Sequence, residues 1–303
     1  MELTEVGTTN TFSQVIVNIW SHLIGAVKFL RDFVGFLNPM FASTGITADG
    51  RVADVAAVSL YYLSVIACFG LSTTFHVFSD HSPRLHLLTN QLDHLGIVLV
   101  MWSTGVSGGH FALQCASTTI RTLYLSMLTS VAACCGLLTL RSRFRQPEFR
   151  CERFSVYILL GISLFGPFLH GWSSFGSLER LNEVAGLRSF LQLTMINTLG
   201  GLLYATRIPE RWFRGTFDLI GNSHNCMHIM AIGGATIRLR GLLAVYERWA
   251  ADDAMLSFCH SLRCDLVAVI LHNQGPTGRI VNCGLYSLHY TFDWAASLQP
   301  EGN

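Results

Sequence analysis

The sequence is poor in charged residues, and this shortage sets the class of protein. Asp, Glu, Lys and Arg make up only 13% of the 303 residues, whereas soluble domains carry about a quarter. The formal net charge of +1 offers no basic surface for nucleic acid, and no glycine-rich nucleotide-binding motif occurs. With half of its residues hydrophobic, the chain is predicted to be an all-α membrane protein that crosses the bilayer several times.

Two other patterns are missing from the sequence. The nine cysteines include no Cys-x-x-Cys pair, and Cys68, Cys134, Cys135 and Cys226 lie within apolar runs, so we interpret them as small packed residues. Residues 1–14 contain no Lys or Arg and therefore lack the positive segment of a secretory signal peptide. We expect them to form a short cytosolic N-terminus before the first span.

Apolar runs predict a bundle of seven membrane-spanning helices within residues 15–250. Several of these runs approach the ~20 residues that a bilayer core requires. The expected spans are residues 15–37, 55–78, 92–112, 123–140, 155–172, 190–205 and 223–242. Residues 251–303 are expected to form a C-terminal tail that is either disordered or aberrant, because their longest apolar run is far too short to span.

Arginine-rich connections predict the orientation of the chain. Five arginines lie between the fourth and fifth expected spans and three between the sixth and seventh: Arg141, Arg143, Arg145, Arg150, Arg153, Arg207, Arg211 and Arg214. Cytosolic loops carry an excess of Lys and Arg, so both connections and the N-terminus are expected in the cytosol, at the plasma membrane or an endomembrane. Arg238 and Arg240 complicate the last span: either the helix is tilted and they face the bundle or the interface, or the chain departs after about Thr236 from the family pattern described below.

Three histidines are the candidate metal ligands. His224 and His228 are four residues apart and share one face of a helix, and His76 ends the second expected span. Asp93 stands near the start of the third span, and counting the crossings places all four residues on one side of the membrane. Three histidines with an open position are typical of a catalytic zinc site. Other histidines, including His22, are expected to be packed or interfacial.

Several ordered motifs carry a resemblance to a known family. They are N-I-W-S-H-L at residues 18–23, Ser72-x-x-x-His76, Leu92-Asp93-x-x-Gly96, R-I-P-E-R at residues 207–211 and Ser223-His224-x-x-x-His228. Together they resemble the progestin and adipoQ receptor family, which includes adiponectin receptors, fungal relatives in zinc and sterol homeostasis, and haemolysin III proteins. The similarity spans roughly residues 18–248 and favours a fungal-type member.

The resemblance implies a site and an activity. It implies a seven-helix fold unrelated to G-protein-coupled receptors, with Zn²⁺ held in the cytosolic half by His76, His224 and His228. It further implies that Asp93 positions the attacking water, and Ser72 matches the serine of the same motif, where it could hydrogen-bond the substrate carbonyl oxygen. Family members resemble ceramidases, so the implied partner is a ceramide-like lipid, with a membrane sterol or other lipid as an alternative.

Three functional classes stay open at this point. The first is a zinc-dependent lipid amide hydrolase with a role in lipid or metal homeostasis. The second is a membrane receptor with a structural zinc site, which Asp93 would close as a fourth ligand. The third is a transporter, although the sequence shows no internal repeats of the kind many transporters have. No extracellular ligand can be inferred from the residues.

Overall fold

The protein was studied as a computed structural model that describes residues 8–42, 51–141, 147–213, 215–217, 220–251 and 259. These residues form helices and turns, with no β-strand in the described part of the chain. The elements are α1 (Thr8–Ala42), α2 (Val52–Phe78), α3 (Pro83–Ala112), α4 (Thr118–Thr139), the 3₁₀ turn η2 (Pro147–Phe149), α5 (Arg150–Ser163), α6 (Gly166–Phe175), α7 (Leu178–Ala185), α8 (Leu187–Thr206) and α9 (Ser223–Ala251). The predicted all-α class is confirmed.

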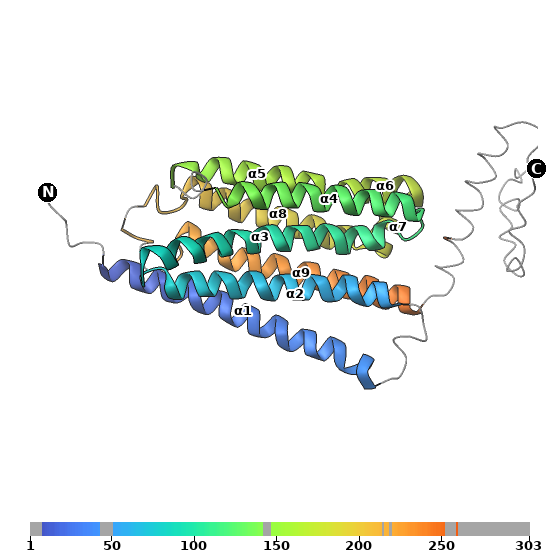
Figure 1. Cartoon of the computed structure of the whole chain (residues 1–303), viewed down its shortest axis with the longest axis horizontal. Helices are drawn as coiled ribbons and strands as arrows, with labels where there is room; N and C mark the ends of the chain where they lie inside the picture. Colours follow the sequence, from blue (N-terminus) through green and yellow to red (C-terminus); the bar gives the residue numbers. More distant parts are fainter. Residues whose placement is uncertain are drawn as a thin grey trace, which may run out of the picture.

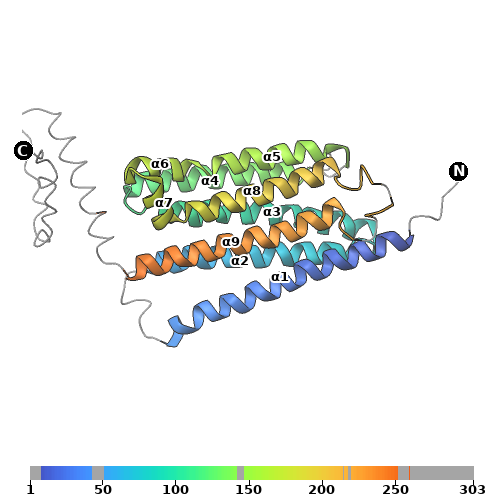
Figure 2. The ribbon, with the colours of Figure 1, turned by 180° about the vertical axis from the view of Figure 1, so that it is seen from behind.

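The long helices lie side by side in one bundle (Figure 1). α1 lies at one edge of the bundle. In both views it diverges from α2 toward the C-terminal end of α1 (Figures 1 and 2). We call the end of the bundle that holds the last turn of α2 and the first turn of α9 the histidine end. The opposite end, where α2 begins and where α3 and α9 finish, is called the far end.

Five helical segments are long and apolar enough to cross a membrane. They are Val52–Phe78, Pro83–Ala112, Thr118–Thr139, Cys151–Phe175 and Ser223–Ala251. The predicted spans that fall in α1 and α8 are not among them. The described residues therefore establish a helical membrane protein with five candidate spans, and a count of seven stays a prediction.

The fifth expected span, residues 155–172, is one segment that is broken into two helices. α5 ends at Ser163, and α6 begins at Gly166 with Pro167 in its first turn. Pro167 has no amide hydrogen, and its ring would clash with the carbonyl of Ser163 if the helix continued unbroken. The expected span is confirmed as the apolar segment Cys151–Phe175, which is long enough to cross a membrane and consists of two helices for this reason.

Serine caps fix where three helices begin. Ser82, Ser117 and Ser177 each have extended backbone, and each side chain accepts a hydrogen bond from the amide three residues later. α3 therefore starts at Pro83, well before the predicted Leu92, because Ser82 caps it and proline suits the first helical position.

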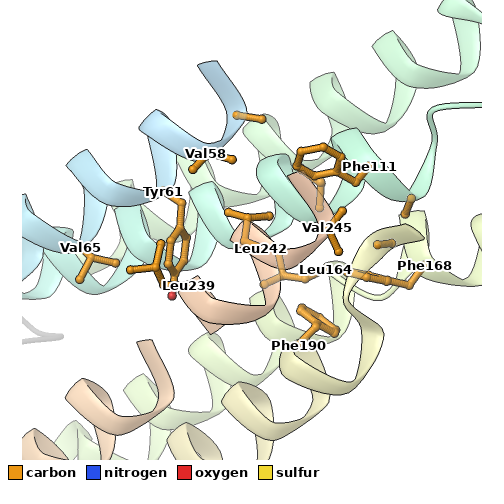
Figure 3. Packing of buried hydrophobic residues seen from close by; sticks show 14 of the residues in the cluster. Val58, Tyr61, Val65, Phe111, Leu164, Phe168, Phe190, Leu239, Leu242 and Val245 are labelled. Carbon is orange, nitrogen blue, oxygen red and sulfur yellow. The ribbon is translucent and has the colours of Figure 1, made fainter. Parts of the chain in front are cut away.

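The buried core lies where α2 and α9 pack against α3, α6 and α8. Val58, Tyr61 and Val65 of α2 face Leu239 and Leu242 of α9 (Figure 3). The hydroxyl of Tyr61 is buried and donates a hydrogen bond to the carbonyl of Ala235, 3.2 Å away. These contacts hold the two helices that carry the candidate metal ligands in a fixed relation.

Arg238 is fully buried within α9, which runs unbroken to Ala251. Its Nη1 donates hydrogen bonds to the carbonyl of Gly186 and to Oγ of Ser189, each at 3.1 Å. The carbonyl of Ala185, the last residue of α7, lies 3.5 Å from the same nitrogen, and a positive charge is favourable at the C-terminal end of a helix. Of the two alternatives for this region, the helix that continues with Arg238 facing the bundle is therefore confirmed, while Arg240 is exposed.

Two cysteines at the far end are joined. Cys115, just after α3, forms a disulfide with Cys259, which lies 144 residues later. No pattern in the sequence indicated this pair, and the interpretation of Cys134 as a packed residue was wrong because it is exposed on α4. Apart from Ala251 and Cys259, the expected tail, like residues 1–7, lies outside the described residues.

Candidate metal centre

The three predicted ligands meet at the histidine end. His76 is in the last turn of α2, and His224 and His228 are in the first two turns of α9. His76 and His228 are buried, and His224 is partly buried. We call these three residues the histidine triad. Among the described residues it is the one group of three or more His, Cys, Asp or Glu side chains placed to hold a metal ion.

The triad directs its Nε2 atoms toward one another. Nε2 of His228 lies 3.4 Å from Nε2 of His76 and 3.0 Å from Nε2 of His224. Two nitrogens bound to one tetrahedral zinc at about 2.0–2.1 Å would lie roughly 3.3 Å apart. The spacing therefore fits a single small cation, and a bound cation would also satisfy nitrogen lone pairs that otherwise face one another.

Asp93 and Ser72 are placed beside the triad but outside it. Ser72 is buried one turn before His76 on α2, and its hydroxyl has no hydrogen-bond partner in the described part of the chain. Asp93, on α3, lies close enough to Ser72 for the hydroxyl to act on its carboxylate as a hydrogen-bond donor, at a geometry outside that of an ordinary hydrogen bond. Neither residue belongs to the group that could hold the metal. The arrangement leaves both side chains available for a ligand.

Helix α1 supplies contacts that the sequence analysis did not anticipate. The ring of His22 stacks on that of His228, with centroids 3.7 Å apart, and on Phe69, at 4.7 Å. Oγ of Ser21 lies 3.3 Å from Nδ1 of His228. His22 is packed, as expected, but it packs against a candidate ligand. The spacing of Asn18, Ser21 and His22 on one helical face was the signal available in the sequence.

A hydrogen bond fastens α1 to the start of α9. Nδ2 of Asn225 donates to Oδ1 of Asn18 at 2.7 Å, and both side chains are buried. The backbone amide of Asn225 in turn donates to Oδ1 of Asn222. These amide contacts lie in the same turn of α9 as His224, so they fix the position from which His224 and His228 project.

The connection between α8 and α9 is attached to the same helix start. The Glu210 carboxylate accepts hydrogen bonds from the amide and the hydroxyl of Ser223. Partial burial by itself would raise the pKa of Glu210, but the two bonds from Ser223 and the charge of Arg207 lower it below its ordinary value. A carboxylate at a helix N-terminus is also favoured by the helix dipole.

A second polar cluster occupies the far end. Oδ1 of Asp54 accepts from Nε2 of Gln114 at 2.9 Å and lies 2.6 Å from Nε2 of His110. Arg121 donates to Oε1 of Gln114 at 3.2 Å. We call Asp54, His110, Gln114 and Arg121 the far-end network. It joins α2, α3 and α4, and the sequence analysis missed it.

Comparisons with known proteins agree with this architecture. The sequence model of a family described as Haemolysin-III related matches residues 10–239, which include the triad, Ser72 and Asp93 but not Cys259. The "Adiponectin receptor protein" of Drosophila melanogaster is 30% identical over 237 residues, covering 76% of this chain and 50% of the relative. The "ADIPOR-like receptor IZH2" of Saccharomyces cerevisiae is 31% identical over 237 residues, covering 76% and 71%.

A plant relative gives a similar match. The "Heptahelical transmembrane protein 4" of Arabidopsis thaliana is 33% identical over 182 residues, covering 60% of this chain and 46% of the relative. The chain thus spans half of the fly relative's length and less than half of the plant relative's.

Proposed function

This chain belongs to the Haemolysin-III related family of integral membrane proteins, and from that premise we propose that it is a zinc-dependent hydrolase of lipid amides. One observation carries the proposal: three Nε2 atoms converge with the spacing of a zinc site, and among the described residues no carboxylate joins them as a fourth ligand. A structural zinc site is closed by four protein ligands, whereas a catalytic one keeps a position open. The donor set of three neutral imidazoles therefore favours catalysis.

The side chains around the triad suit an amide hydrolysis. Bound zinc supplies Lewis-acid chemistry, which polarises a carbonyl oxygen and makes water acidic enough to lose a proton near neutral pH. Asp93 accepts that proton at a carboxylate oxygen and orients the attacking water. Ser72, whose buried hydroxyl has no partner, donates a hydrogen bond to the carbonyl oxygen as its negative charge develops.

The place of the triad in the bundle favours a lipid substrate. The triad lies among helices that are apolar enough to cross a bilayer, and α2 and α9 both carry ligands. A ceramide-like amide carries two long apolar chains, which can stay in the hydrocarbon region while the amide reaches the site. The products would be a sphingoid base and a fatty acid.

We further propose seven spans and a cytosolic N-terminus. α1 and α8 lie alongside the five candidate spans, and the 20 residues of α8 extend about 30 Å, the thickness of a bilayer core (Figure 1). Arg207 and Arg211 lie at the histidine end, which supports a cytosolic location for it. The far end carries the Cys115–Cys259 disulfide, which fits an oxidising compartment. Arg143, Arg145 and Arg214 lie outside the described residues.

A receptor with a structural metal is the second candidate function. It is favoured by the printed names of the fly and yeast relatives, both of which contain the word receptor. In that case the zinc would stabilise the histidine end, and Asp93 would contribute as a ligand after rearrangement. Zinc content and turnover would then fall together when Asp93 is removed.

The decisive experiment separates metal binding from turnover. Fatty acid released from a ceramide is measured per zinc-loaded molecule of the full chain in detergent, for wild type, Asp93→Ala, Ser72→Ala and His76→Ala. Asp93→Ala is expected to keep its zinc and lose about 10²–10⁴-fold in rate, because a general base is lost. Ser72→Ala should cost less. A wild-type rate no higher than that of His76→Ala would exclude the hydrolase and leave the receptor.

A further inference from the structure

The outer nitrogen of His228 has a specific partner on α1. Since Nε2 of His228 faces His76 and His224, its Nδ1 atom points the other way, 3.3 Å from Oγ of Ser21. The Ser21 hydroxyl donates its own hydrogen to the carbonyl of Asn18, 3.0 Å away. With that hydrogen committed, Oγ can act toward Nδ1 only as an acceptor. In this arrangement the imidazole carries its proton on Nδ1, and the backbone carbonyl of Asn18 lies within reach of the same ring.

This direction of hydrogen bonding decides which nitrogen can bind a metal. A neutral imidazole with its proton on Nδ1 has its lone pair on Nε2, the atom that faces the other two ligands. The opposite tautomer would place a hydrogen between the three histidines and a lone pair against Oγ of Ser21. We propose that Ser21 is a positioning residue for the metal site: it selects the tautomer of His228 and orients its ring. This inference rests on the proposed zinc binding.

The neighbouring residue on α1 restrains the same ring in a second direction. His22 lies nearly parallel to His228, with an interplanar angle of 15° and a centroid separation of 3.7 Å, and Phe69 lies beyond it. Stacking limits tilting of the ring, while the Ser21 contact limits its rotation within the plane. Helix α1 itself is held by the bond between Asn18 and Asn225. Helix α1, which provides no ligand, thus orients the candidate ligand His228, which lies 207 residues after Ser21.

An isosteric pair of variants tests the role of the hydroxyl. Ser21→Thr keeps an oxygen that can accept from Nδ1, whereas Ser21→Val has nearly the same shape without it. Zinc affinity of the full chain in detergent is measured by competition with a chelator. Ser21→Val and Ser21→Ala are expected to bind zinc about 10–100-fold more weakly than wild type, the usual cost of losing a partner of a ligating histidine. Ser21→Thr should stay near wild type.

A matched control comes from α3. Ser103 is fully buried and donates to the carbonyl three residues earlier at 3.0 Å, as Ser21 does. Ser103→Ala should leave zinc affinity unchanged. Thermal unfolding with the metal removed supplies a second readout: Ser21→Val should unfold within a few degrees of Ser21→Thr, because the hydroxyl acts through metal binding. The difference between the two should widen once zinc is added.

The outcomes separate this inference from the proposed function. A wild-type chain that takes up no zinc overturns both. Zinc binding by wild type with equal affinity in Ser21→Val overturns the role of Ser21 alone. Loss of stability in zinc-free Ser21→Val as large as in the zinc-loaded protein would also overturn it, since a purely structural hydrogen bond gives that result.

Discussion

The two ends of the bundle use the same kinds of polar residue in opposite ways. At the far end, Asp54 accepts from Gln114 and pairs with His110, and Gln114 accepts from Arg121, so donors meet acceptors. At the histidine end, Nε2 atoms face each other at 3.0–3.4 Å, and the hydroxyl of Ser72 lacks a partner in the described part of the chain. The first arrangement is complete, while the second could hold a cation.

The difference shows how a structural cluster can be told from a binding site. A buried network whose members satisfy each other stabilises the fold and has little left to offer a ligand. A buried cluster of ring nitrogens that face one another offers lone pairs that a bound cation can satisfy. The histidine end holds more histidines than the far end, but it is the pairing of donors with acceptors that separates a structural cluster from a binding site.

The largest expected effect compares one histidine from each end. His228→Ala should reduce zinc affinity by more than about 100-fold, because even the loss of a ligand's hydrogen-bond partner costs about 10–100-fold. His110→Ala should keep about one zinc per chain, since His110 pairs with Asp54 and contacts no triad residue in the hydrogen bonds described. Elemental analysis of the two purified variants makes the measurement. Equal metal loss in both would remove the distinction between the ends.

A smaller effect is expected from the far-end disulfide. Cys115→Ser should lower the free energy of unfolding by about 2–5 kcal/mol, the usual cost of removing a native disulfide, and leave zinc content unchanged. Cys134→Ser, at an exposed free cysteine, serves as the control and should alter neither quantity. Labelling with a bulky maleimide before and after reduction checks the bond itself. Labelling of Cys115 in the unreduced chain would contradict it.

The smallest effect concerns the acid stability that Glu210 gives to the histidine end. The pKa of Glu210 is lowered in the folded chain, so its stabilisation is complete above its ordinary pKa of 4.5 and disappears as pH falls through the lower folded value. Zinc-free Glu210→Gln should therefore unfold at a lower temperature than wild type at neutral pH, by a margin that vanishes in acid. Thermal unfolding across this range measures it. A difference in unfolding temperature that does not change with pH would show that the stabilisation does not come from the ionised carboxylate of Glu210.

Much of the helical framework could be predicted from apolar runs, and the errors have local causes. The start of α3 was missed because the apolar run begins only at Leu92, whereas Ser82 and Pro83 together form a helix start. The break between α5 and α6 follows from Pro167 and could have been read from the sequence. The continuation of α9 past Arg238 could not be predicted from the sequence, because it depends on the carbonyls of Ala185 and Gly186, which accept hydrogen bonds from the guanidinium.

The sequence by itself determined the histidine triad, since two ligands share a helical face four residues apart and alternation of crossings brings the third to the same end. Only the tertiary structure decided what surrounds it. The contacts of Ser21 and His22 with His228, and the bond of Cys115 with Cys259, join positions more than a hundred residues apart. Such contacts depend on which faces of two helices meet, and that choice is made by packing of the whole bundle rather than by any local pattern.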